Sequence, residues 1–81
     1  MATTQLAHQI QTGEAIIRLA NVHDIQMTDL YLVSLPLGLG KVDPTHYTVD
    51  QFTLLQKEVE GLSYYGLLPA YIENLKRSEG L

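Results

Sequence analysis

Residues 48–62 read TVDQFTLLQKEVEGL, and within them the signals for the start, the buried face and the end of a helix agree. Thr48 followed three residues later by Gln51 is a capping box, in which each side chain can accept a hydrogen bond from a backbone N–H that the first turn leaves unpaired. Asp50 adds negative charge where the helix dipole is positive. The pattern predicts a helix that follows Thr48, and Gly61 is its expected stop, because glycine readily takes a left-handed conformation.

An apolar stripe runs along this predicted helix at the i, i+3, i+7, i+10 spacing of one face, and its members are Phe52, Leu55, Val59 and Leu62. The opposite side is polar and carries Asp50, Thr53, Lys57 and Glu60. A helix with two such sides buries the apolar one against other elements. We therefore expect the rest of the chain to pack around this helix.

The N-terminal part of the chain predicts another helix, from a cap at Thr3 or Thr4 to about residue 20. Its apolar seam alternates four and three residues apart, as in paired helices, through Leu6, Ile10, Gly13, Ile17 and Ala20. Ile16 and Leu19 widen the seam on one side. Gly13 costs about 1 kcal/mol in a helix relative to alanine, which favours close approach of another backbone at that point.

Residues 29–35 are open to two interpretations. Thr28 can cap a short helix that ends before Pro36, since proline lacks the N–H that a continuing helix needs. The apolar run 30–33 is also typical of a short buried strand, and periodicity cannot separate the two at this length. The cap and the helical flanks favour the helix.

The middle of the chain, residues 35–47, reads LPLGLGKVDPTHY and predicts a loop, because two prolines and two glycines forbid a long regular element. The loop is apolar, so it should lie across the core or under a partner. Asp43 and Pro44 predict a turn that leads to the cap at Thr48. The run 38–41, GLGK, lacks the spacing of a phosphate-binding Walker loop.

A last helix is predicted from Pro69 to about Ser78, since proline fits the first turn of a helix. Its apolar face consists of Leu68, Ile72 and Leu75, helped by Tyr71. Glu73 and Arg77 have the i, i+4 spacing of an ion pair, and Gly80 is the expected end. The fold class is thus an all-α bundle of three to four short helices with an apolar Pro/Gly loop in the middle.

The composition limits the class of protein. Eighty-one residues suggest one small helical domain, 1–81, and the absence of cysteine excludes disulfide frameworks and thiolate metal sites. Only 17% of residues are charged, against about 25% in an average domain, so the surplus of apolar residues favours a homo-oligomer. The net charge of −4 argues against nucleic acid and membrane surfaces as partners. No signal peptide or 18-residue apolar run is visible, and we expect a cytoplasmic protein.

A helix-turn-helix template fits residues 19–35 in part. The small Ala20 stands where two such helices come close, but Asp24 occupies the turn position where glycine usually supplies a positive φ. The surface that would read DNA offers Gln26, Thr28 and Asp29 and no basic residue, although phosphate contacts supply most of the affinity for DNA. Two consecutive packed helices without DNA binding remain the favoured interpretation.

Candidate residues for catalysis or metal binding are few. Asp43, His46 and Asp50 form the nearest approach to a carboxylate–imidazole group, yet turns and helix caps have the same composition. The histidines, His8 among them, are too scattered to pair on one helix face, and no serine has the setting of a nucleophile. We expect no catalytic residue, no cofactor and no metal.

Several apolar residues lie off the predicted helix stripes, and these are candidates for a partner-binding surface: Leu37, Leu39, Leu54, Tyr64 and Tyr65. Tyrosine is frequent at interfaces because it joins a large apolar ring to a polar tip. The sequence therefore predicts a small non-enzymatic adaptor or regulator that self-associates as a homodimer or docks on a larger protein. The alternative is a dimeric helix-turn-helix transcriptional regulator.

Overall fold

The computed structural model describes residues 13–80 of the chain. This part contains a helix at residues 13–22, α2 (Met27–Ser34), the short 3₁₀ helix η1 (Pro44–His46), α3 (Val49–Tyr64) and α4 (Leu68–Ser78). No strand occurs in it, so the all-α prediction is confirmed. The predicted caps Thr3 and Thr4, the seam residues Leu6 and Ile10, and His8 lie outside the described residues.

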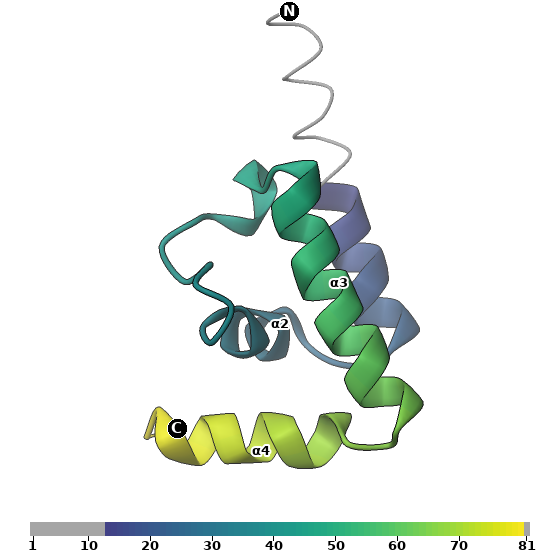
Figure 1. Ribbon diagram of the computed structural model, residues 1–81, viewed down its shortest axis with the longest axis vertical. Coiled ribbons are helices and arrows are strands. Elements are labelled where there is room, and N and C mark those ends of the chain that lie inside the picture. The colour runs from purple at the N-terminus through teal and green to yellow at the C-terminus, as the bar shows by residue number, and fades with distance from the viewer. Residues whose placement is uncertain (1–12, 81) are drawn as a thin grey trace, which may run out of the picture.

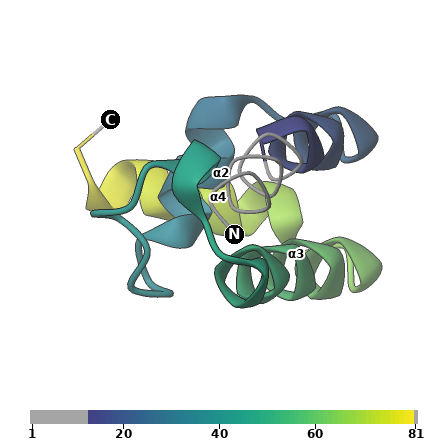
Figure 2. The ribbon, with the colours of Figure 1, turned by 90° about the horizontal axis from the view of Figure 1, so that it is seen from above.

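The helices surround one core. The helix at residues 13–22 and α3 run in the same direction (Figure 1), and both are seen nearly end-on in Figure 2. The last helix, α4, runs crosswise beneath the C-terminal end of α3 (Figure 1). Between them, α2 contacts both α3 and α4, and α3 contacts α4. The core cluster draws on all four helices and on the middle loop: Ile16, Leu19, Ala20, Leu30, Val33, Leu39, Tyr47, Leu55, Val59, Leu68 and Ile72.

The start of α3 has the predicted capping box. The backbone N–H of Gln51 donates to Thr48 Oγ1 over 3.2 Å, and the N–H of Thr48 donates to Gln51 Oε1 over 2.9 Å. The predicted stripe faces the core, with Leu55 and Val59 fully buried and Phe52 and Leu62 packed against them at its edge. Local signals therefore placed both the start and the orientation of this helix correctly.

The predicted stop at Gly61 is wrong. α3 continues through Gly61 to Tyr64, and the left-handed glycine is Gly66, with φ of 70°. Helical glycine costs only about 1 kcal/mol, whereas the extra turn carries Leu62 against the core. The N–H of Leu67 then donates to the Leu62 carbonyl over 2.8 Å, which closes the end of the helix.

The segment predicted as either helix or strand is the helix α2, but it starts earlier than predicted. Its N-cap is Gln26 rather than Thr28, because the Asp29 carboxylate accepts a hydrogen bond from the Gln26 N–H over 3.0 Å. The helix ends at Ser34, two residues before Pro36, as expected. α2 carries apolar residues on most of its sides, as is typical of a helix that is surrounded by other elements.

The first helix buries part of the predicted seam, together with the side on which Ile16 and Leu19 widen it. Ile16, Leu19 and Ala20 are in the core, whereas Ile17 is 54% exposed. Ile16 and Leu19 project together because residues three apart share a helix face, and Ile17 points away from them. A Cβ on Gly13 would lie 3.8 Å from Thr45 Cγ2, an ordinary contact, so the part of the chain that the structure describes has no close backbone approach there.

The middle loop covers the core. Leu39 is only 5% exposed, Tyr47 is buried, and Leu37 and Val42 pack against the core cluster. This corrects the prediction that Leu39 is surplus apolar surface. The expected turn at Asp43 and Pro44 is present, since the Thr45 N–H donates to Asp43 Oδ1 over 2.9 Å and η1 follows.

The last helix matches its prediction except in its ion pair. α4 starts at Leu68, one residue before Pro69, and buries Leu68 and Ile72. Gly80 has a φ of 76° at its end. Within residues 13–80 Glu73 and Arg77 form no ion pair, and it is Lys76 that reaches Asp29 on α2. The i, i+4 pair of Glu14 and Arg18 is present at 3.8 Å, on the exposed side of the first helix.

Candidate functional site

α3 and the residues just after it expose several large apolar side chains, and the two most exposed are at the C-terminal end of the helix. Tyr64 is 83% exposed, Tyr65 73% and Leu54 51%, and Leu67 in the connection to α4 is exposed as well. At about 100° per residue, Leu54, Gly61 and Tyr65 fall within a narrow strip of the α3 surface, with Tyr64 at its side. We call these four residues, Leu54, Gly61, Tyr64 and Tyr65, the tyrosine surface.

The two tyrosines contact each other rather than the core. Their ring centroids are 4.9 Å apart and the rings are nearly perpendicular, at 85°. Edge-to-face pairing of this kind adds about 0.5–1.5 kcal/mol beyond burial and restrains both rings. Tyr71 behaves differently, since it packs against the core from α4. Of these three tyrosines, which are close together in the sequence, Tyr71 packs against the core and Tyr64 and Tyr65 form an exposed pair.

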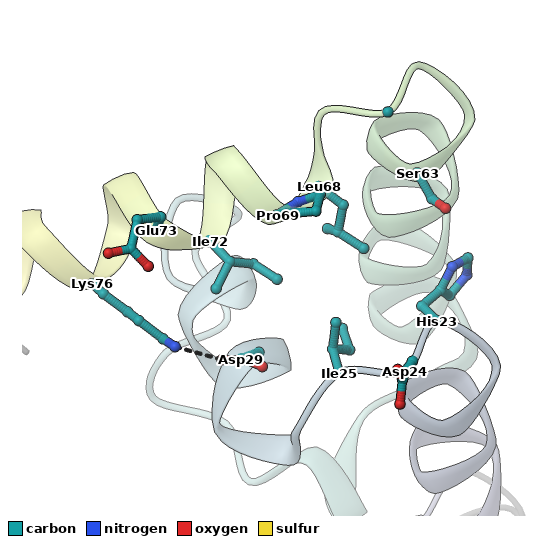
Figure 3. Close-up of a pocket in the computed structure, with 11 residues that line it drawn as sticks. His23, Asp24, Ile25, Asp29, Ser63, Leu68, Pro69, Ile72, Glu73 and Lys76 are labelled. Atoms are coloured by element: carbon teal, nitrogen blue, oxygen red, sulfur yellow. Dashed lines mark ion pairs between the residues drawn. The ribbon is translucent and has the colours of Figure 1, made fainter.

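An open groove of about 590 Å³ lies where α3 and α4 meet (Figure 3). The end of α3, the start of α4 and the turn before α2 form its walls. Leu68, Ile72 and Ile25 point toward its middle, while Lys76 and Glu73 lie at one end and His23 and Ser63 at the other (Figure 3). Its rim includes Ser63 and Gly66, which flank the tyrosine pair in the chain. Ser63 comes nine residues after Leu54 and therefore lies about 180° from it around α3, so the groove opens on the other side of this helix from Leu54.

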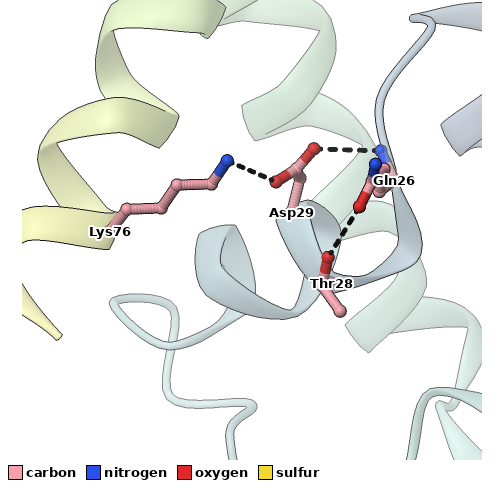
Figure 4. Close-up of polar contacts among 4 residues, drawn as sticks. All are labelled: Gln26, Thr28, Asp29 and Lys76. Carbon is pink, nitrogen blue, oxygen red and sulfur yellow. Dashed lines mark hydrogen bonds and ion pairs between the residues drawn. The ribbon is translucent and has the colours of Figure 1, made fainter. Parts of the chain in front are cut away.

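The polar centre of the groove is the carboxylate of Asp29, which is buried (Figure 4). Asp29 Oδ2 accepts from the Gln26 N–H at 3.0 Å, and Oδ1 lies 3.6 Å from Lys76 Nζ. The Thr28 hydroxyl lies 3.5 Å from Gln26 Oε1. The first and third contacts are local to the start of α2, and the ion pair of Asp29 with Lys76 joins α2 to α4.

The structure brings together some of the residues predicted to bind a partner and separates others. Leu54, Tyr64 and Tyr65 are exposed on α3, whereas Leu37 and Leu39 pack into or against the core. Sequence reasoning missed Gly61 as part of the surface and the Asp29–Lys76 pair. Gly61 could have been assigned to the surface, because it comes seven residues after Leu54 and so lies on the same side of the helix. The ion pair of Asp29 and Lys76 has no local signal, because the two residues come from different helices.

Asp43 and His46 belong to a turn and Asp50 to the first turn of α3, as the favoured interpretation of these three residues predicted. The Thr45 N–H and hydroxyl donate to Asp43 Oδ1, and these bonds, with a smaller contribution from nearby His46, hold the pKa of the Asp43 carboxyl below its usual 3.8. Because the pKa is lowered on folding, the stabilisation is present above the ordinary carboxyl pKa and is lost as the pH falls through the folded-state value. Among residues 13–80 no group of three or more acidic and histidine side chains could hold a metal ion.

Comparisons with known proteins add no family to these observations. No protein-family model, no curated protein and no solved structure matches the chain. None of the helices described is long and apolar enough to span a lipid bilayer.

Proposed function

We propose that this protein is a small non-enzymatic interaction module, an adaptor or regulator, whose contact surface is the tyrosine surface on α3. The observation that carries the proposal is the exposure of two adjacent tyrosines that pair with each other outside the core. Two large rings held in water lose part of the stabilisation that burial would give them, at about 25 cal/mol per Å² of apolar surface. A partner that covers them recovers this free energy.

The chemistry of the surface also supports docking of a protein. Tyrosine side chains have few rotatable bonds, so little conformational entropy is lost when a partner immobilises them. Each ring also joins an apolar body to a polar hydroxyl tip, a combination that is frequent at protein interfaces.

Replacing Tyr64 and Tyr65 together by serine should abolish association while leaving the fold intact. Both side chains are exposed, so their removal costs little stability, whereas aromatic anchors dominate interface energies at about 2 kcal/mol or more each. The measurement is light scattering of the purified chain, with affinity capture from a native lysate to include larger partners. Circular dichroism checks the fold.

Val22→Ser is the matched control for this pair, because Val22 is apolar and exposed but belongs to the first helix. The control should associate like the parent. Equal association of all three proteins would refute the tyrosine surface as the contact site. A parent chain that neither self-associates nor captures any protein would refute the proposed function.

A second candidate, the helix-turn-helix regulator, is favoured by one observation. The turn between the first helix and α2 contains Asp24 with φ of 54°, the positive value that such turns require. Aspartate tolerates this conformation better than most residues because its short side chain can bond locally. Two features argue against DNA binding. Asp24 and Asp29, beside the start of α2, are acidic, and residues 21–40 contain no Lys or Arg.

We therefore expect no DNA binding above the nonspecific level at physiological salt. A gel shift over a salt series tests this, because nonspecific binding depends on phosphate contacts and weakens as salt rises. A sequence-selective, salt-resistant shift that disappears when Gln26 and Thr28 become alanine would make DNA binding the leading function. Asn74→Ala on α4, equally exposed, is the control for a polar change away from the turn.

A further inference from the structure

Asp24 closes the C-terminal end of the first helix, at a position that glycine usually occupies. Its φ of 54° lies in the left-handed region. Its N–H donates to the Asn21 carbonyl over 3.2 Å, and the next N–H, of Ile25, donates to the Ala20 carbonyl over 3.0 Å. These two bonds define a Schellman motif, in which the left-handed residue is most often glycine and sometimes asparagine. The backbone of this turn therefore has no need of a carboxylate.

The charge of Asp24 also opposes the helix that it closes. The C-terminal end of a helix is the negative end of its dipole, so a carboxylate is unfavourable where a cation would be favourable. Asp24 is exposed, and no Lys, Arg or His among residues 13–80 forms an ion pair with it. The stability of one chain does not explain why this position carries a negative charge.

Glu73 is a second carboxylate without a cation, and it lies at the opposite end of the same groove. Asp24 lies beside His23 at one end, and Glu73 lies on the exposed side of α4 at the other (Figure 3). Lys76, one turn from Glu73, pairs instead with Asp29 over 3.6 Å, and no other cation of the described residues pairs with Glu73. The groove therefore has an unpaired negative charge at each end.

The middle of the groove is apolar. Leu68 and Ile72 form its floor and are only 4% and 6% exposed, and Ile25 and Pro69 also line it (Figure 3). Pro69 is exposed and Ile25 is partly so. A groove of about 590 Å³ is large enough to hold an apolar group of a partner. Along its length the groove is thus negative, then apolar, then negative again.

We infer that this groove binds a basic segment of a partner protein, in which an apolar side chain stands between lysine or arginine residues. The apolar side chain occupies the middle of the groove, and the flanking cations pair with Asp24 and Glu73. The net charge of −4 favours the approach of a basic partner, whereas an acidic segment would place like charges at both ends. The inference goes beyond the proposed function, because neither Asp24 nor Glu73 belongs to the tyrosine surface.

Synthetic peptides test this inference on the full chain. The probes are the capped peptides KKLKK, KKGLGKK and KKGGLGGKK, whose three spacings sample the separation of the two ends. At least one should bind at low salt with a dissociation constant below about 1 mM, measured by titration of the protein's amide chemical shifts. Glycine in place of the leucine should raise this constant about tenfold, because the apolar contact is lost.

The same titrations can overturn the inference. It fails if none of the three peptides binds, or if the peptide without leucine binds as tightly, since only a diffuse attraction of charges then acts. It also fails if a peptide with glutamine or glutamate in place of every lysine binds equally well. Such a result would give the groove a neutral or an acidic partner.

Asp24→Asn is the decisive variant, because we expect it to stabilise the fold and to weaken binding. Asparagine suits the turn and removes the charge at the end of the helix, so the melting temperature should rise by about 2–5 °C. Combined with Glu73→Gln, it should raise the dissociation constant of the peptide about tenfold. A melting temperature that does not rise would mean that the monomer itself explains the carboxylate. That result, or an unchanged dissociation constant, overturns the inference.

Asp50→Asn with Glu60→Gln is the matched control for the double variant. It makes the same two exchanges at exposed positions of α3 that do not line the groove, and it changes the net charge equally. The control should bind the peptide like the parent. An equal loss of binding in both double variants would show that only the net charge acts, and it would overturn the groove as the site.

Tyr64→Ser with Tyr65→Ser separates this inference from the proposed function. The variant should lose association through the tyrosine surface and keep the parent's affinity for the peptide. If it loses the peptide while Asp24→Asn with Glu73→Gln retains it, the peptide binds at the tyrosine surface and the groove is refuted. If the parent binds the peptide as expected but captures no protein, the proposed function fails and the groove stands.

Discussion

Replacing Leu55 with alanine is expected to lower the free energy of unfolding by about 3–5 kcal/mol. Leu55 is 1% exposed and lies at the centre of the core, where Leu30, Val33 and Val59 are also fully buried. The substitution removes buried apolar surface and leaves a cavity that fixed helices cannot close. A chain of 81 residues has only about 4–12 kcal/mol of total stability, so the loss is a large fraction of it.

Leu54→Ala is the matched control, since it makes the same chemical change one residue earlier in α3 at a side chain that is 51% exposed. It should cost less than about 1 kcal/mol, because little buried surface is lost. Urea denaturation of both variants, at concentrations where the chain is monomeric, gives the two values. Similar losses for Leu54 and Leu55 would mean that α3 does not face the core as described.

Leu39→Ser is expected to destabilise the protein by about 3–5 kcal/mol and to reduce its helical content at 25 °C. The reason is that Leu39, although in a loop, is buried in the core cluster, so serine would lose apolar contacts and bury a hydroxyl without an assigned partner. Thermal unfolding followed by circular dichroism measures the effect. The result matters for the function, because loss of association in this variant would reflect unfolding rather than loss of a contact surface.

Tyr65→Ser provides the comparison for Leu39→Ser. Tyr65 is exposed and outside the core cluster, so its replacement should cost only the contact with Tyr64, about 1 kcal/mol, and should lower the melting temperature much less than Leu39→Ser does. The two positions looked equivalent in the sequence, as apolar residues outside the helix stripes. A Leu39→Ser protein as stable as Tyr65→Ser would contradict the placement of the middle loop across the core.

The candidate site could be predicted from the sequence only in part. Leu54, Tyr64 and Tyr65 were identifiable because they lie off an apolar stripe whose period is clear, and a helix period assigns each of its residues to a side. Leu37 and Leu39 were misassigned because a loop has no period. Without a repeating geometry, nothing in the residues 35–47 tells whether an apolar side chain turns inward or outward.

The sequence by itself determined the features of this protein that depend on residues close together in the chain. The capping box at Thr48, the α3 stripe, the end of α2 before Pro36 and the turn at Asp43 were all predicted and are present. Each depends on hydrogen bonds or side-chain directions within about one to three turns of backbone, which propensity and spacing report directly.

Only the tertiary structure decided the features that depend on competition between distant residues. It left Ile17 of the predicted seam exposed and carried α3 past Gly61. It also paired Lys76 with Asp29, where the sequence had predicted a pair of Glu73 and Arg77. In each case the local alternatives differ by about 1 kcal/mol or less, and contacts between helices contribute more than that. Packing between the helices therefore decides which of the local alternatives the protein adopts. This packing cannot be read from residues that are close together in the chain.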